Sequence, residues 1–152
     1  MHESLDDLTA AYMADRGFPI DVRIPSDLRY IERVVEIVTR TCVALSFSAR
    51  ACNLLVPVAL TEALSNAIIY GNGEDVTKAV RVRALIIERA LVLEVVDEGI
   101  GFEFDSCLHD PTDPLHLDRE DGRGLFLMTR LMDRVERFSD GGNVVRLTLR
   151  QS

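Results

Sequence analysis

The chain has 152 residues, 47% of them hydrophobic, a size and composition that suit one domain with a substantial core. Its formal net charge of −8 opposes broad electrostatic attraction to nucleic acid or to an anionic membrane. Because the three cysteines lack paired spacing, the acidic start lacks a signal-sequence layout and no apolar run approaches a membrane span, we expect reduced thiols and a cytoplasmic location.

Residues 1–19 are interpreted as an N-terminal extension to the domain, which occupies residues 20–152. In the extension, Leu5, Leu8 and Tyr12 follow helical spacing, which fits either a short amphipathic helix or a mobile arm. From residue 20 to residue 24 apolar and charged residues alternate, and this predicts a half-buried strand that Pro25 ends.

Two helical patterns follow the first strand. Ser26 is expected to cap the first helix, whose apolar face comprises Leu28, Ile31, Val34, Val35, Val38, Cys42 and Leu45. The second pattern opens near Ser48 and runs to Tyr70, where Gly71-Asn72-Gly73 ends it. Pro57 lies inside this pattern and must kink or divide the helix, because proline removes a backbone hydrogen bond.

The rest of the chain is predicted to be mostly strands. Residues 79–87 alternate, and residues 91–96 form a second β-rich run, so the two are expected to pair as a hairpin. The stretch 99–124 is rich in glycine and acidic residues, lacks periodicity and is long for a loop, which suggests a functional lid. The remaining elements are a helix over 125–132 and strands over 135–138 and 144–149.

This order of elements predicts an α/β (α+β) two-layer sandwich, with helices on one face of a largely antiparallel sheet. Strict alternation of strands and helices is absent, which argues against a doubly wound dinucleotide-binding domain. In addition, Gly99-Ile100-Gly101 lacks the third glycine that the dinucleotide fingerprint requires.

Glu62 and Asn66 are four residues apart in the second helix, so their side chains project from one face and can reach one ligand. A carboxylate can accept a proton from a hydroxyl group, and an amide oxygen is a hard ligand suited to Mg²⁺. Taken alone, the pair fits an ordinary solvated helix face better than a ligand site.

Asp97 follows directly from a predicted buried strand and precedes Gly99 and Gly101. An acid at a strand end can accept a hydrogen bond from the exocyclic amine of a purine, and the glycines allow a ligand to approach the backbone closely. The alternative is an ordinary turn of aspartate and glycine.

A second glycine-rich segment, Gly122-Arg123-Gly124, precedes the helix predicted to start near Leu125. Free N–H groups at a helix N-terminus favour phosphate, and Arg123 can either touch that phosphate or face solvent. A glycine turn before a helix is also a common structural feature without any ligand.

Together these segments resemble the motifs of the GHKL ATPases over about residues 20–150. Glu62-Ala-Leu-Ser-Asn66-Ala is similar to their N box, Asp97-Glu-Gly99-Ile-Gly101 to their G1 box, and Gly122-Arg-Gly124-Leu-Phe to their G2 box. Thr61–Gly71, the compact lid and Leu127–Asp133 are further similar to the anti-sigma-factor serine kinases of the RsbW type.

The resemblance implies a Bergerat-type ATP-binding fold with ATP and Mg²⁺ as cofactors. Glu62 would be the general base, Asn66 would hold Mg²⁺, and Asp97 would recognise adenine, with the glycines framing the lid. Arg33 is the nearest match to a partner-binding arginine of the first helix.

The implied activity is that of an anti-sigma factor that phosphorylates a serine or threonine of an anti-sigma-factor antagonist. Its partners would be a sigma factor and that antagonist, with a homodimer possible. The alternative is a non-catalytic switch that binds nucleotide and sequesters a sigma factor or another regulator. A sensor histidine kinase fits less well, because the histidines lie in the extension or the lid, and Cys107, His109 and His116 lack the spacing of a zinc motif.

Overall fold

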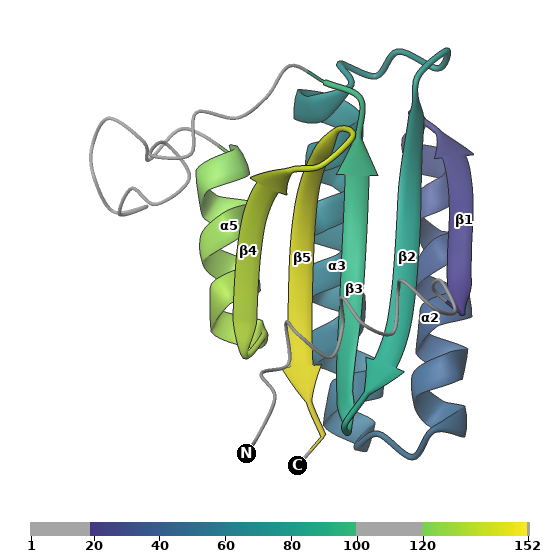
Figure 1. Ribbon diagram of the computed structural model, residues 1–152, viewed down its shortest axis with the longest axis vertical. Coiled ribbons are helices and arrows are strands. Elements are labelled where there is room, and N and C mark those ends of the chain that lie inside the picture. The colour runs from purple at the N-terminus through teal and green to yellow at the C-terminus, as the bar shows by residue number, and fades with distance from the viewer. Residues whose placement is uncertain (1–18, 100–119, 152) are drawn as a thin grey trace.

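The structure is a computed structural model that describes residues 19–99 and 120–151 (Figure 1). The predictions made for residues 1–18, for most of the lid, for Gly101, and for Cys107, His109 and His116 lie outside these described residues.

Five strands form one antiparallel sheet in the order β1-β2-β3-β5-β4. The strands are β1 (Ile20–Pro25), β2 (Ala79–Ile87), β3 (Ala90–Asp97), β4 (Arg134–Ser139) and β5 (Asn143–Arg150). Each predicted strand is therefore confirmed, and 79–87 and 91–96 pair as the expected hairpin. Pro25 is the last residue of β1, as expected from its missing N–H.

The helices cover one face of this sheet, and the other face carries no described element (Figure 1). They are α2 (Ile31–Ala44), α3 (Val56–Asn66) and α5 (Glu120–Leu131). The predicted two-layer α+β sandwich is confirmed. Its core lies between the layers, where the alternating residues Val80, Val82 and Ala84 of β2 meet the buried side of α3.

The first helix differs from its prediction at both ends. Ser26 does not cap it. Instead, the Asp27 carboxylate accepts a hydrogen bond from Arg29 N, at 3.0 Å, and begins a 3₁₀ turn, η1 (Leu28–Tyr30). That turn rotates Leu28 out of the apolar stripe, so Leu28 is exposed, as is Leu45 beyond the last turn. The centre of the stripe, at Val34, Val38 and Cys42, is buried as predicted.

The second helical pattern is one continuous run divided into three parts. Ser48 caps its start by accepting a hydrogen bond from Ala51 N, at 3.1 Å. A π-helical turn, η2 (Ala51–Leu55), precedes α3, and another, η3 (Ala67–Gly71), follows it. Pro57 stands at the start of α3, which confirms that proline divides the pattern. Because Pro57 has no N–H to donate to the preceding turn, the regular α-helical hydrogen-bond ladder is interrupted there.

The run Ala51–Gly71 is long and apolar enough to cross a membrane by length and composition, with a mean hydropathy of 1.5. The expectation that no segment approaches a membrane span was therefore wrong on those criteria. In the fold this run is the central helix of the core, because its residues Val56, Leu60, Leu64 and Ile68 are fully buried. A core helix that packs on a sheet and on two helices acquires this composition without a membrane.

Candidate functional site

Glu62 and Asn66 open onto a pocket of about 320 Å³ between α3 and α5. The pocket is lined by Glu62, Ser65, Asn66, Ile69, Tyr70, Gly124 and Leu127. Both predicted polar residues of α3 are therefore on one face, as their spacing of four indicates, and that face borders a cavity rather than open solvent. The pocket combines a carboxylate, an amide and two hydroxyl groups with the apolar side chains of Ile69 and Leu127.

Gly124 of α5 lies close against this pair. A Cβ atom at position 124 would come within 2.9 Å of both Glu62 Oε2 and Asn66 Nδ2. Only glycine leaves those two side chains in their present positions, so the absence of a side chain at Gly124 helps to define the pocket. This is a packing reason for a glycine that the sequence analysis assigned to a turn.

The prediction that Gly122-Arg123-Gly124 precedes a helix starting near Leu125 is wrong. The helix α5 begins at Glu120, and the three residues lie in its first turns. Glycine is a poor helix former, but packing of α5 on α3 at Gly124 overrides that preference. Gly122 and Arg123 still belong to the first turn, where backbone N–H groups have no intrahelical acceptor.

Asp97 lies at the end of β3 and is only 3% exposed. Its Oδ1 accepts hydrogen bonds from Asn143 Nδ2, at 2.9 Å, and from Gly99 N, at 2.8 Å. Burial raises the pKa of this carboxyl above its usual range, an effect that outweighs the two hydrogen bonds. Asn143, which pairs with Asp97 in the sheet, falls in the connection between the strands predicted over 135–138 and 144–149.

The second carboxylate oxygen of Asp97 faces the end of η3. A Cβ atom at Gly71 would collide with Asp97 Oδ2, and a Cβ atom at Gly99 would collide with the carbonyl oxygen of Gly71. These glycines therefore permit close approach between η3 and the end of β3. Gly71 follows Asn66 by five residues, so one helical run connects the Asp97 region with the Glu62 pocket.

Asn72 is a buried residue that the sequence analysis treated only as part of a helix terminator. Its amide donates to Ser26 Oγ, at 2.9 Å, and to Ala79 O, at 3.0 Å, and accepts from Glu98 N, at 2.8 Å. It thus joins the end of η3 to residues at the ends of β1, β2 and β3, beside Asp97. An asparagine between two glycines is the only sequence signal that pointed to this role.

The structure thus brings Glu62, Asn66 and Gly124 together at one pocket, and places Asp97 and Gly99 at the far end of the same helical run. Arg33 lies away from the pocket and from Asp97. It is exposed on α2, where its Nη1 is 4.0 Å from Glu36 Oε2. Within residues 19–99 and 120–151, no three histidine, cysteine or acidic side chains gather as a metal site. A metal held here would therefore need ligands beyond such a cluster, such as an amide oxygen and the phosphates of a nucleotide.

Comparison with known proteins agrees with this arrangement. Residues 24–149 match the family described as histidine kinase-like ATPase domain. The serine-protein kinase RsbW of Bacillus velezensis is 31% identical over 134 residues, which cover 85% of this chain and 83% of the relative. RsbW of Bacillus subtilis is 38% identical over 96 residues, 60% of each chain. The anti-sigma F factor of Clostridium acetobutylicum is 34% identical over 100 residues, 63% of this chain and 67% of the relative.

A solved structure shows the same fold. The crystal structure of the RsbU and RsbW domains of a Mycobacterium tuberculosis protein superposes with a TM-score of 0.62 at 14% identity. The superposition covers 87% of this chain and 32% of that protein, so this chain spans about a third of its length.

These matches define the class of protein. The chain belongs to the histidine kinase-like ATPase domain family, and within that family it is of the RsbW type. The pocket on α3 and the buried acid at the end of β3 are consequently parts of a nucleotide-binding domain.

Proposed function

We propose that the chain is an ATP-dependent serine/threonine protein kinase that acts as an anti-sigma factor in the cytoplasm. It binds a sigma factor and phosphorylates an anti-sigma-factor antagonist. The observation that carries the proposal is the convergence of Glu62, Asn66 and Gly124 on one pocket, in a chain whose relatives are named serine-protein kinase RsbW and anti-sigma F factor.

Each polar residue of the site has a role that suits its chemistry. Glu62 accepts the proton of the attacking serine or threonine hydroxyl. The hydroxyl oxygen then bonds to the γ-phosphorus of ATP, and the bond between that phosphorus and the leaving oxygen of ADP breaks. The amide oxygen of Asn66 would hold Mg²⁺, and the bound ion would neutralise charge at the phosphates.

Asp97 accepts a hydrogen bond from the exocyclic amine of adenine. This role suits a buried carboxylate whose described hydrogen bonds engage only Oδ1. Gly99 and Gly101 let the base and sugar approach the backbone. The first turn of α5, with Gly122 and Arg123, presents N–H groups to the phosphates, and Gly124 leaves room beside Glu62 and Asn66. The catalytic domain in this proposal comprises residues 20–152, with residues 1–19 as an extension.

The test separates chemistry from binding at Glu62. Glu62→Gln keeps the shape of the side chain and removes the base, so transfer of labelled phosphate to the antagonist should fall roughly 10²–10⁴-fold. ATP affinity, measured by calorimetry, should change little. Asn66→Ala should weaken Mg²⁺-dependent binding as well. Glu88→Gln, in the exposed β2–β3 turn, is the matched control and should retain full transfer.

Two results would contradict the proposal. Undiminished transfer by Glu62→Gln would remove Glu62 from the mechanism. A wild-type chain that captures a sigma factor in a nucleotide-dependent way, yet phosphorylates none of the candidate antagonists, would instead establish a non-catalytic binding switch.

A further inference from the structure

A closed set of hydrogen bonds joins Asp97, Gly99 and Asn143 at one end of the sheet. Gly99 N and Asn143 Nδ2 both donate to Asp97 Oδ1, at 2.8 and 2.9 Å. Asn143 Nδ2 also donates to Gly99 O, at 3.1 Å. Asp97 and Asn143 are only 3% and 2% exposed. The amide of Asn143 therefore holds both the acid and the backbone that follows it in one arrangement.

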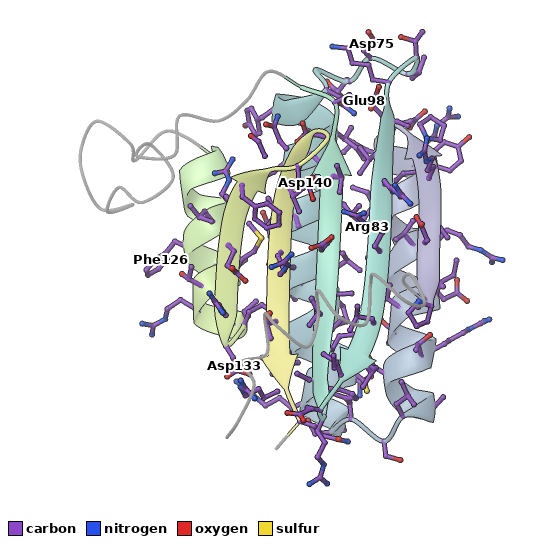
Figure 2. All side chains as sticks on the ribbon, in the orientation of Figure 1. Asp75, Arg83, Glu98, Phe126, Asp133 and Asp140 are labelled. Carbon is purple, nitrogen blue, oxygen red and sulfur yellow. The ribbon has the colours of Figure 1, made fainter. Side chains whose placement is uncertain are left out.

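The turn between β4 and β5 places Asn143 opposite Asp97. The two residues are direct partners in the β3–β5 ladder. A Cβ atom at Gly142 would lie 2.4 Å from Asp97 O, so only glycine, here with a φ of +147°, lets the turn lie this close. Figure 2 shows Asp140 of this turn and Glu98, the residue after β3, at the same end of the sheet. The turn and the end of β3 thus form one side of the proposed adenine site.

The two donors distinguish the oxygens of Asp97. A carboxylate oxygen has roughly two positions at which it accepts hydrogen bonds, and the donors from Gly99 and Asn143 fill those of Oδ1. Oδ2 faces Gly71 and is the oxygen left for the exocyclic amine of adenine. While the carboxyl is ionised, Oδ2 can only accept. It therefore attracts the 6-amino group of adenine and repels the 6-carbonyl oxygen of hypoxanthine or guanine.

Protonation of Asp97 would reverse this preference. With Oδ1 engaged by two donors, the proton would reside on Oδ2 and convert it to a donor. Burial raises the pKa of Asp97, and the hydrogen bond from Asn143 is the largest influence that opposes this rise. The hydrogen bond from Gly99 and the positive charges of Arg137, on β4, and Lys78, before β2, act in the same direction as Asn143.

We propose that Asn143 is the positioning residue that gives the site its preference for a 6-amino purine, because it orients Asp97 and keeps Oδ2 an acceptor. This inference rests on the proposed role of Asp97 in binding adenine, and it adds the residue that sets the specificity of that contact. Asn143 acts through Asp97, since its amide donates to the acid and to the backbone of Gly99.

Binding of ATP and of inosine triphosphate (ITP) tests the proposal, because ITP has a 6-carbonyl group and an N1 proton where ATP has the 6-amino group. Asn143→Leu keeps a branched side chain and removes the donor. Calorimetry from about pH 5 to about pH 7.5 gives the ratio of the two affinities, in which titration of the shared triphosphate cancels. The preference of Asn143→Leu for ATP should fall roughly 10–100-fold at a pH at which the wild type retains it. The loss should grow as the pH falls, because protonated Oδ2 donates to the 6-carbonyl group.

A second measurement does not need a nucleotide. Carbon-13 NMR of the Asp97 carboxyl group in the free protein should show its titration at higher pH in Asn143→Leu than in the wild type. Asn143→Ser, whose side chain is too short to reach Oδ1, serves if leucine prevents folding. Val145→Ala is the matched control, because it removes core packing from the same face of β5 and leaves the donor in place. Its affinity ratio and carboxyl titration should match those of the wild type.

The other outcomes separate this inference from the proposed function. An unchanged affinity ratio and an unchanged carboxyl titration in the Asn143 variants overturn the inference and leave the adenine contact of Asp97 in place. A ratio that changes equally at every pH, with the titration unmoved, assigns Asn143 a purely structural role and also overturns it. A wild type that binds neither nucleotide, or binds ATP and ITP equally, contradicts the proposed role of Asp97 itself, and the inference fails with it.

Discussion

Two buried carboxylates of β3, Glu94 and Asp97, lie three residues apart and face opposite sides of the sheet. Each is only 3% exposed. Glu94 forms two ion pairs, one between its Oε1 and Arg83 Nη2 and one between its Oε2 and Arg146 Nη2, each at 2.7 Å. Both of its carboxylate oxygens are therefore engaged. The described hydrogen bonds of Asp97 engage Oδ1 alone, and its other oxygen faces Gly71.

The difference between them lies in the partners and not in the burial. Glu94 is the centre of a cross-strand row in which charges alternate along Asp21, Arg83, Glu94, Arg146 and Glu136. Opposite charges directly across neighbouring strands stabilise the sheet. Asp97 has neutral hydrogen-bond partners and a pKa raised by burial, a costly arrangement that suits a ligand-binding group. Burial of an acid therefore does not by itself identify a site.

The strongest test of this contrast is Glu94→Ala. It leaves Arg83 and Arg146 half-buried or deeper without their shared carboxylate, so we expect a loss of about 3–5 kcal/mol in the free energy of unfolding. Urea denaturation measures the loss, and ATP affinity of the folded fraction should be unchanged. A stability change below about 1 kcal/mol would show that the row contributes no more than an exposed pair.

Asp97→Asn should have the opposite profile. ATP binding should weaken by about 1.5–3 kcal/mol, the usual range for a hydrogen bond to a charged group, as measured by calorimetry. Folding stability at neutral pH should not fall, because Asn143 and Gly99 can still donate to the amide oxygen and no charge is buried. Equal ATP affinity in the variant and the wild type would remove Asp97 from the nucleotide site.

The pH dependence of stability gives a second measurement at Asp97. Because its pKa is raised in the folded state, protonation favours folding: this contribution is present below the usual aspartate pKa and is lost as pH rises through the folded-state value. In Asp97→Asn that dependence should disappear. Urea midpoints of the wild type and of Asp97→Asn, compared from about pH 4 upward, show whether the stability contribution of Asp97 falls as the pH rises.

The smallest effect is expected at the end of the charge row. Asp21 accepts two hydrogen bonds from Arg81, and this lowers its pKa, but both side chains are about a third exposed. Asp21→Ala should therefore cost only about 0.2–1 kcal/mol. The lowered pKa means that this contribution is present above the usual aspartate pKa and is lost as pH falls through the folded-state value. A loss comparable to that of Glu94→Ala would show that the whole row acts as one unit.

The sequence determined the order of elements, because period-two and helical patterns depend on neighbouring residues alone. It located every strand of the sheet and the helix carrying Glu62 and Asn66, whose spacing of four places both on one face whatever lies opposite. The low helix propensity of glycine led to a wrong prediction for the start of α5. Packing of α5 on α3 keeps Gly122 and Gly124 within the helix.

Only the tertiary structure decided what each polar residue meets. Asn72 and Asn143 both looked like turn residues, yet they hold the region around Asp97 through contacts 26 and 46 residues apart in sequence. The engagement of Glu94 by two arginines likewise depends on strand register, which brings Arg83 and Arg146 to either side of it. Such long-range pairings fix whether a buried acid is satisfied or left open to a ligand, and local sequence pattern carries no information about them.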